Sequence, residues 1–210
     1  GVQSLSQQSF VSSKSTAGGY ASMSKNEAMH IRQIIAADNA KTRTIMWQSE
    51  AAENGAFVEY RVKGKEQISS APATNEPFTD DKITTYLHTV TLSNLTPDTK
   101  YEYRVGYGDK RSEWQDFATA GKGSFKAIIF PDSQSNDYRG WEKLAQAAGK
   151  ANQDAAFFVN MGDLVDNGED HTQWRAWFDS LRGIIDKIPV APILGNHETY
   201  DLNWKVRMPT

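Results

Sequence analysis

Apolar and polar positions alternate in short runs between about residues 28 and 119. Strings such as TRTIMW, AFVEYRVKG, LHTVTLSNL and YEYRVGYG are separated by Asn, Gly, Asp and Pro. Short alternating runs with turn residues between them indicate an all-β sandwich. Trp47 ends one early run, and we expect it to lie between the two sheets, where a sandwich buries large aromatic side chains.

The pattern changes after the small-residue, Gly-rich segment 119–124, which we interpret as a linker. Continuous apolar runs, typical of strands covered on both faces, then alternate with segments whose apolar residues have helical spacing. The runs are 125–130, 155–160 and 190–195, and the helical segments are 138–152 and 171–185. Strands that alternate with helices predict a parallel sheet.

These patterns divide the chain into three parts. Residues 1–24 are rich in Ser, Gln and Gly without apolar periodicity, and we expect a flexible leader. The predicted sandwich occupies 25–120, and the first βαβαβ half of an α/β domain occupies 125–210. The predicted fold class is therefore an all-β sandwich followed by α/β.

Composition excludes several classes of protein. The 210 residues carry a net charge of −3 without a run of Lys or Arg, which argues against nucleic-acid binding. There is no cysteine, so disulfides and thiolate metal sites are excluded. No apolar stretch approaches the roughly 20 residues of a membrane span. The chain lacks both a signal-peptide pattern and an initiator Met, so we expect a processed product that is secreted, periplasmic or on the cell surface.

Polar residues follow each of the three predicted parallel strands. Asp132, Asp163 and Asn196 lie one β-α unit apart, which is about 30 residues. The carboxyl ends of parallel strands line a ligand crevice, so we expect these side chains to converge. Turn-forming acids and amides at strand ends are the ordinary alternative. Carboxylates gathered without basic neighbours favour a cation, and oxygen with imidazole ligands suits Fe, Mn or Zn.

The spacing of these blocks resembles a known family. Asp132, the Gly162-Asp163 pair and the string GNHE (195–198) are similar to the first three blocks of the calcineurin-like metallophosphoesterases. The preceding sandwich and the string QWRAWFDSL resemble the purple acid phosphatases. Within the sandwich, Leu95–Tyr101 resembles the tyrosine corner of fibronectin type III domains.

The resemblance implies a dinuclear phosphoesterase that hydrolyses phosphate monoesters with metal-activated water. Asp132 would bind one metal, Asp163 would bridge both, and Asn196 would bind the second. His197 would contact the substrate phosphate or act as a general acid. The implied cofactors are two metal ions, Fe with Zn, Mn or Fe, and the implied partner is a phosphate ester.

The sequence also departs from the family. Asp166 stands where purple acid phosphatases have a Tyr, and it is interpreted as a substituted ligand, an outer hydrogen-bond acceptor or a loop cap. No histidine follows His197, although the family completes its site with later histidines. We therefore expect a remaining catalytic half on the same parent chain, and we expect the 210 residues alone to bind metal weakly and to be inactive.

Two alternative functions remain open. A phosphodiesterase or nucleotidase of the same superfamily would use the same metal pair. A non-catalytic binding module would keep the phosphoesterase half as a scaffold. Of the other histidines, His171 is expected to be exposed in the first turn of a helix, and His88 is expected at the surface or half-buried. The pattern leaves the substrate and the oligomeric state open.

Overall fold

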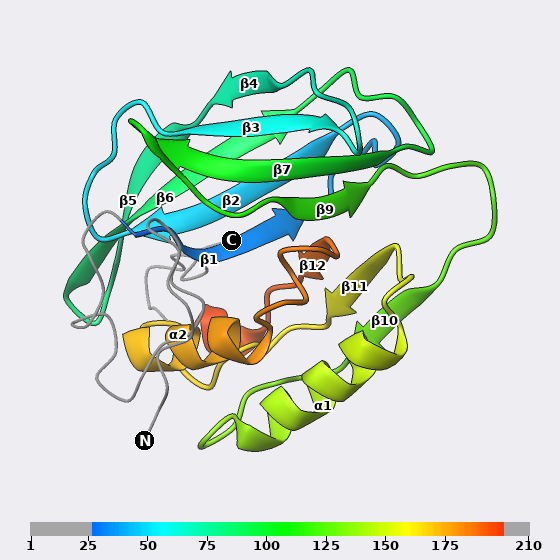
Figure 1. The fold of residues 1–210 in the computed structure, drawn as a ribbon. Coiled ribbons are helices and arrows are strands. Elements are labelled where there is room, and N and C mark those ends of the chain that lie inside the picture. Colours follow the sequence, from blue (N-terminus) through cyan, green and yellow to red (C-terminus); the bar gives the residue numbers. More distant parts are fainter. Residues whose placement is uncertain (1–26, 200–210) are drawn as a thin grey trace, which may run out of the picture.

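The predicted sandwich is present in the computed structural model, which describes residues 27–199 (Figure 1). Its strands form two antiparallel groups, β1-β2-β6-β5 and β4-β3-β7 with β8 and β9. The strands are β1 Met29–Ile34, β2 Arg43–Ser49, β3 Phe57–Val62, β4 Ser69–Pro72, β5 Thr74–Asp80, β6 Ile83–Leu92, β7 Lys100–Tyr107, β8 Lys110–Arg111 and β9 Gln115–Ala118. The sandwich prediction is confirmed, although β4 and β5 lie in a polar stretch where no strand was predicted.

The sandwich core contains the expected aromatic side chains. Trp47 is fully buried among the inward residues of both sheets, as predicted. The Tyr101 hydroxyl accepts a hydrogen bond from the backbone N–H of Thr96 at 2.8 Å, which is the contact that defines a tyrosine corner. The Tyr101 contact fixes the start of β7 against the turn before it.

The second half of the described chain contains the predicted parallel strands and helices. The elements are β10 Ala127–Phe130, α1 Arg139–Ala151, β11 Phe157–Asn160, α2 His171–Ser180 and β12 Val190–Pro192. Strand β11 pairs in parallel with both β10 and β12, which confirms the βαβαβ prediction. The second helix ends at Ser180, before the predicted Ile185, and Gly183 in the following turns has a φ of +79°. A left-handed residue of this kind interrupts a helix, while Ile184 and Ile185 still reach the core.

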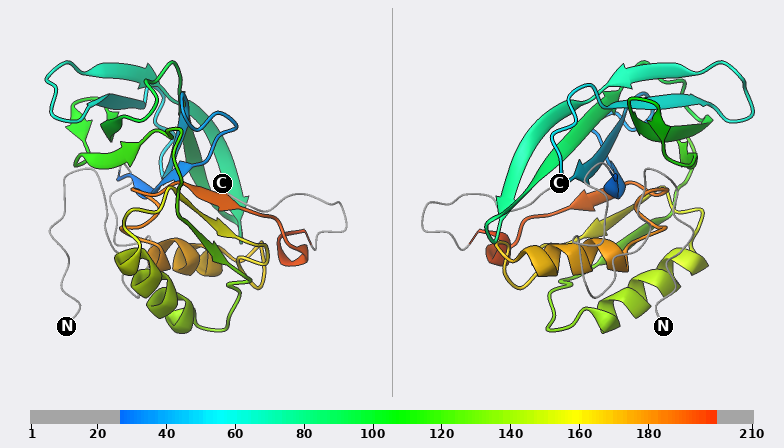
Figure 2. Two further views of the ribbon diagram at one scale, coloured as in Figure 1. Left: turned by 90° about the vertical axis from the view of Figure 1, so that its right-hand side faces the viewer. Right: turned by 60° about the vertical axis from the view of Figure 1, so that its left-hand side comes forward.

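The parallel strands continue the larger sheet of the sandwich. Seven strands run in the order β10-β11-β12-β1-β2-β6-β5, and the two halves join where Ile34 of β1 pairs with Val190 of β12. The Ile35 N–H donates to the Val190 carbonyl at 3.1 Å. The views in Figure 2 show this sheet passing from the sandwich into the helical half. The two parts therefore share backbone hydrogen bonds in addition to the connecting segment.

Buried polar side chains reinforce this junction. Gln33 Nε2 donates to the carbonyls of Asp116 at 2.9 Å and Asp186 at 2.8 Å, and Gln33 Oε1 accepts from Arg43 at 2.6 Å. The Tyr103 hydroxyl also donates to the Asp186 carbonyl. Since hydrogen-bonded polar groups are expensive to separate in a buried place, these contacts fix the orientation of the two parts.

The parallel strands are covered by helices on one face (Figures 1 and 2). Phe130 and Phe158 point to that face, where Phe130 packs both on Trp141 of α1 and on Phe158. Alternate residues point to the opposite face, where Ile129 is 64% exposed and Met161 is 55% exposed. A parallel sheet is normally covered on both faces, so this apolar face is unusual.

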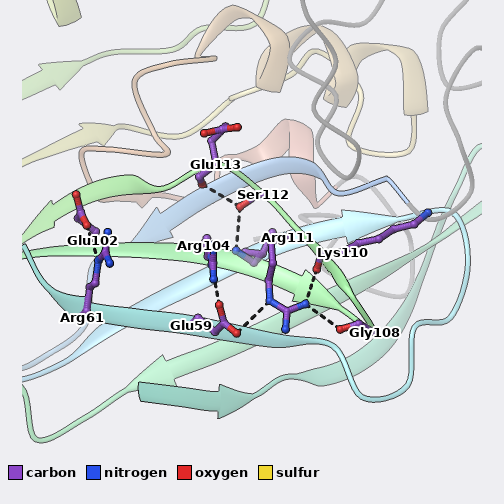
Figure 3. A network of polar contacts seen from close by, with 10 residues as sticks. Glu59, Arg61, Glu102, Arg104, Gly108, Lys110, Arg111, Ser112 and Glu113 are labelled. Carbon is purple, nitrogen blue, oxygen red and sulfur yellow. Dashed lines mark hydrogen bonds and ion pairs between the residues drawn. The ribbon is translucent and has the colours of Figure 1, made fainter. Parts of the chain in front are cut away.

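The smaller sheet carries interleaved Arg and Glu side chains (Figure 3). Glu59 on β3 accepts from Arg104 at 2.6 Å and from Arg111 at 3.0 Å. Burial raises the pKa of the Glu59 carboxyl, but the hydrogen bonds and charges of both arginines outweigh burial and lower that pKa below its usual range. The contacts cross from β3 to β7 and β8, so we assign them to sheet stability.

Two further sequence-based expectations concern the leader and a membrane span. The leader predicted at 1–24 lies outside the described residues. Between residues 27 and 199, neither helix has the length and hydrophobicity that crossing a bilayer requires.

Candidate metal centre

Three loops meet at the carboxyl ends of the parallel strands. The first loop (131–138) follows β10, the second loop (161–170) follows β11, and the third loop (193–199) follows β12 and includes the short 3-10 helix η2, Asn196–Glu198. The backbone N–H groups of Ser133 and Gln134 donate to the Asp163 carbonyl at 3.2 and 2.9 Å. The His197 N–H donates to Asp163 Oδ1 at 3.0 Å. Asp163 thus connects the first and third loops.

Asp163 occupies a constrained position at this meeting point. Its φ of +43° places it in the left-handed region, which costs a non-glycine residue of the order of 1 kcal/mol. Gly195 lies directly against it, since a Cβ at Gly195 would come within 2.1 Å of Asp163 Oδ1. Asp163 is half-buried, whereas Asp132 and Asn196, next to these contacts in the chain, are exposed.

His197 is oriented by the second loop. Its Nδ1 lies 2.5 Å from the Asp166 carbonyl oxygen and 3.5 Å from Asp166 Oδ1. A carbonyl has no proton to give, so Nδ1 carries the proton and donates it. The Gly168 N–H donates to the His197 carbonyl at 3.1 Å. Asp166 therefore contacts His197 chiefly through its backbone, and its exposed carboxylate is the weaker contact.

Glu198 is a residue of this site that the sequence interpretation missed. Its side chain is fully buried, and its two oxygens accept from the backbone N–H groups of Val165 at 3.1 Å and Gly195 at 2.8 Å. One carboxylate thus joins the second and third loops. Its place in the GNHE string indicated that it lies near the site, but the string does not show that its carboxylate faces inward.

A second missed group anchors the first loop. Asn160, at the end of β11, is fully buried; its amide donates to the Pro131 carbonyl at 2.7 Å. Its Oδ1 accepts from Ser133 Oγ at 2.9 Å and from Trp177 Nε1 at 3.0 Å. Polar residues in an apolar strand and helix give no local sign of such a network, because the partners are far apart in the sequence.

The first turn of α2 holds the second loop. Asp170 caps the helix by accepting from the Gln173 N–H at 3.1 Å. Gln173 Oε1 accepts from the Asn167 N–H at 2.8 Å, and Trp174 Nε1 donates to the Gly168 carbonyl at 2.7 Å. The loop that carries Asp163 and Asp166 is therefore fixed to the helix that follows it.

The side chains of these loops fit part of a metal centre. Within residues 27–199, the Asp132 carboxylate and Asp163 Oδ2 make no hydrogen bond, so both are available as ligands. Carboxylate and amide oxygens are suitable ligands for hard or borderline cations. However, no group of three His, Cys, Asp or Glu side chains in that range could hold an ion. The described residues therefore fit a partial ligand set and do not complete a dinuclear centre.

Two predicted histidine environments are wrong. His171, expected to be exposed, is buried at the start of α2, and its Nδ1 contacts Asp80 of the sandwich at 2.6 Å. His88 is fully buried and stacks on Trp47, and burial lowers its pKa to about 4. In both cases a tertiary contact, rather than the local pattern, determines the burial of the ring.

Three strand-end loops that meet at an aspartate beside a parallel sheet agree with the class to which the family models assign the chain, the metallophosphoesterases. Residues 28–119 match the family model described as purple acid phosphatase, N-terminal domain, and residues 125–210 match calcineurin-like phosphoesterase. The chain belongs to the purple acid phosphatase-like members of the calcineurin-like phosphoesterase superfamily.

Solved structures agree with this fold. The purple acid phosphatase PPD1 from yellow lupin (Lupinus luteus) seeds is similar over 81% of this chain, with 22% identity and a TM-score of 0.70. The structure of PhoD is similar over 80% of this chain, with 12% identity and a TM-score of 0.52. The chain spans 35% and 38% of the lengths of these two proteins. No curated protein matches the chain in sequence.

Proposed function

We propose that the protein hydrolyses phosphate monoesters and that a pair of bound metal ions activates the attacking water. The observation that carries this proposal is the meeting of three strand-end loops at Asp163, through its carbonyl and its Oδ1. Such loops place ligands from distant parts of the chain around one point. The family supports phosphate esters as the substrate class.

Asp132, Asp163 and Asn196 would hold the metal ions in this proposal. A carboxylate has two oxygens, and the His197 N–H fixes Asp163 Oδ1, so the direction of Oδ2 is also determined. Asn196 would contribute a neutral oxygen and would add no negative charge. When bound, the metal ions would polarise the phosphoryl group and lower the pKa of a coordinated water to near neutrality. Suitable pairs are Fe with Zn, Mn or Fe.

His197 would act on the substrate from beside these ligands. Since Nδ1 donates to the Asp166 carbonyl, Nε2 is the nitrogen that would meet a phosphate oxygen or the leaving group. A protonated Nε2 would donate its proton to the departing alkoxide as a general acid. The contact with Asp166 would fix the ring plane so that the proton transfer needs little rearrangement.

Replacement of a metal ligand tests the proposal. In the full-length protein supplied with Mn²⁺ or Zn²⁺, Asp163→Asn is expected to lower the hydrolysis of p-nitrophenyl phosphate by more than about a hundredfold. Asp166→Asn is the matched control, because its main contact with His197 is through the backbone, and we expect a loss of less than about tenfold. Near-normal turnover by Asp163→Asn would contradict the assignment.

A second candidate is a non-catalytic binding module in which this part of the fold is a scaffold. The partial ligand set within residues 27–199 favours it for these residues taken alone. Calorimetric titration with Mn²⁺ separates the two: stoichiometric two-ion binding by the 210-residue chain would exclude the scaffold. Parallel rates on p-nitrophenyl phosphate and bis-p-nitrophenyl phosphate distinguish a monoesterase from a diesterase.

A further inference from the structure

The sandwich contacts the helix that follows the second loop. The turn between β5 and β6 lies beside the start of α2, and both views in Figure 2 place this turn near the end of the described chain. A pocket of about 430 Å³ separates part of the turn from the second loop, with Lys82 on one side and Asn167 and Glu169 on the other.

Asp80 and His171 make the polar contact beside this pocket. Asp80 is the last residue of β5 and His171 is the first residue of α2, and both are at least 95% buried. Nδ1 of His171 donates to Oδ1 of Asp80 at 2.6 Å. Because both groups are removed from water, breaking this bond would leave a desolvated carboxylate, which is costly.

The same face of α2 meets the sandwich again two turns later. Residues 171 and 178 are seven positions apart and therefore lie on one side of a helix. Phe178 stacks on His30 of β1 with centroids 4.4 Å apart, and the Arg32 guanidinium lies 4.7 Å from the same ring. The sandwich thus holds α2 at both ends, with the ring-stacking and cation–π contacts of Phe178 at one and the Asp80–His171 hydrogen bond at the other.

Contacts continue from the start of α2 to the candidate catalytic histidine. The first turn of α2 binds the second loop through Gln173 and Trp174, the latter at the Gly168 carbonyl. The N–H of the same Gly168 donates to the His197 carbonyl. A displacement of the first turn of α2 would therefore change the position of the second loop and of His197.

We propose that Asp80 of the sandwich is a positioning residue for the active site, acting through His171 on the second loop and His197. The sandwich would then help to align the residues that bind metal and substrate, besides being attached to them. The catalytic meaning of this role rests on the proposed function, but the mechanical connection does not.

Amide hydrogen exchange of the 210-residue chain tests the connection without metal or substrate. In Asp80→Ala, the Gly168 and His197 amides are expected to exchange about tenfold faster, because the hydrogen bond that limits their local opening is lost. Asp80→Asn keeps an acceptor for His171 and should show a smaller acceleration. Asp81→Asn, an exposed neighbour on the same turn, is the matched control and should leave both rates unchanged.

Asp80→Ala also lowers the global free energy of unfolding, so the amides of β3 and β7, far from α2, should accelerate, but by less than those of Gly168 and His197. Unchanged exchange at Gly168 and His197 in Asp80→Ala would overturn the proposal. Equal acceleration in β3 and β7 would also overturn it, because the role of Asp80 would then be general stability. If Asp80→Ala does not fold, the same comparison in Asp80→Asn decides. A phosphatase assay is not involved, so failure here is distinct from failure of the proposed function.

Discussion

At the scale of single residues, the junction between the two parts contains a carboxyl group in an unfavourable environment. The backbone carbonyl of Asp186 accepts hydrogen bonds from the side chains of Gln33 and Tyr103. Its side-chain Oδ1 is buried and makes no hydrogen bond within the described part of the chain. Burial raises the pKa of the Asp186 carboxyl to about 6, against the opposing charges of Lys187 and Arg182. The group is therefore easier to bury when protonated.

This pKa predicts a pH-dependent effect of Asp186→Asn. The folded-state pKa lies above the ordinary 3.8, so the folded protein binds this proton more tightly and the free energy of unfolding falls as pH rises from about 4 to about 6. Asparagine does not ionise, so the variant avoids this fall in the free energy of unfolding. Urea unfolding should show the variant more stable by about 2 kcal/mol at pH 8 and nearly equal to wild type at pH 4. Asp154→Asn, which alters an exposed ion pair, should give no gain at pH 8; a gain for Asp186→Asn that is the same at both pH values would contradict the prediction.

At the scale of elements, the three loops depend on close backbone approach. The third loop reaches Asp163 because Gly195 has no side chain, and Glu198 then joins it to the second loop. Gly162 allows the approach from the other side, with a φ of +86°. The two glycines in the Gly-Asp and GNHE strings therefore serve the packing between loops.

We expect Gly195→Ala to separate the second and third loops. The added Cβ would overlap Asp163 at both Oδ1 and the backbone N, so the chain must shift and lose the His197–Asp163 hydrogen bond. The expected loss in the free energy of unfolding is about 1–3 kcal/mol in urea unfolding. Gly123→Ala has open space around its Cβ and should change stability by less than about 0.5 kcal/mol. Equal effects of the two substitutions would argue against the close approach.

Sequence patterns predicted those elements whose signals are local. The apolar runs indicated β10, β11 and β12, and the position of Tyr101 after a Pro-Asp turn indicated the tyrosine corner. Strands β4 and β5 have few apolar residues and are held by backbone pairing with β3 and β6, so alternation did not reveal them. Asn160, Glu198 and His171 are buried by partners from distant segments, and no local period records such contacts.

At the scale of the whole molecule, the parallel strands expose an apolar face opposite α1 and α2. Alternation along β10 and β11 sends Ile129 and, just after β11, Met161 to this face, and Phe125 packs on Phe157 beside them. Contiguous exposed apolar surface of this kind promotes association. The continuous apolar character of these runs predicted strands covered on both faces, but one covering layer is present among residues 27–199.

Charge on this face should reduce association of the 210-residue chain. We expect the double variant Ile129→Lys with Met161→Lys to bind less of the dye ANS and to sediment more nearly as a monomer, because the apolar surface is interrupted. Leu144→Lys, at an exposed position on α1, is the control and should change neither property. Unaltered dye binding in the double variant would show that this face is not the adhesive surface.

The pairing of β1 with β12 limits which other domains could replace the sandwich. Ile34 of β1 pairs with Val190 of β12, the strand that leads into the third loop. A different N-terminal domain would have to present an unpaired strand in the same register and direction as β1. Otherwise β12 would lose a hydrogen-bonded neighbour. Two units joined by a tether could be replaced independently. Here, the backbone pairing of β1 with β12 means that the sandwich and the α/β part are expected to evolve together.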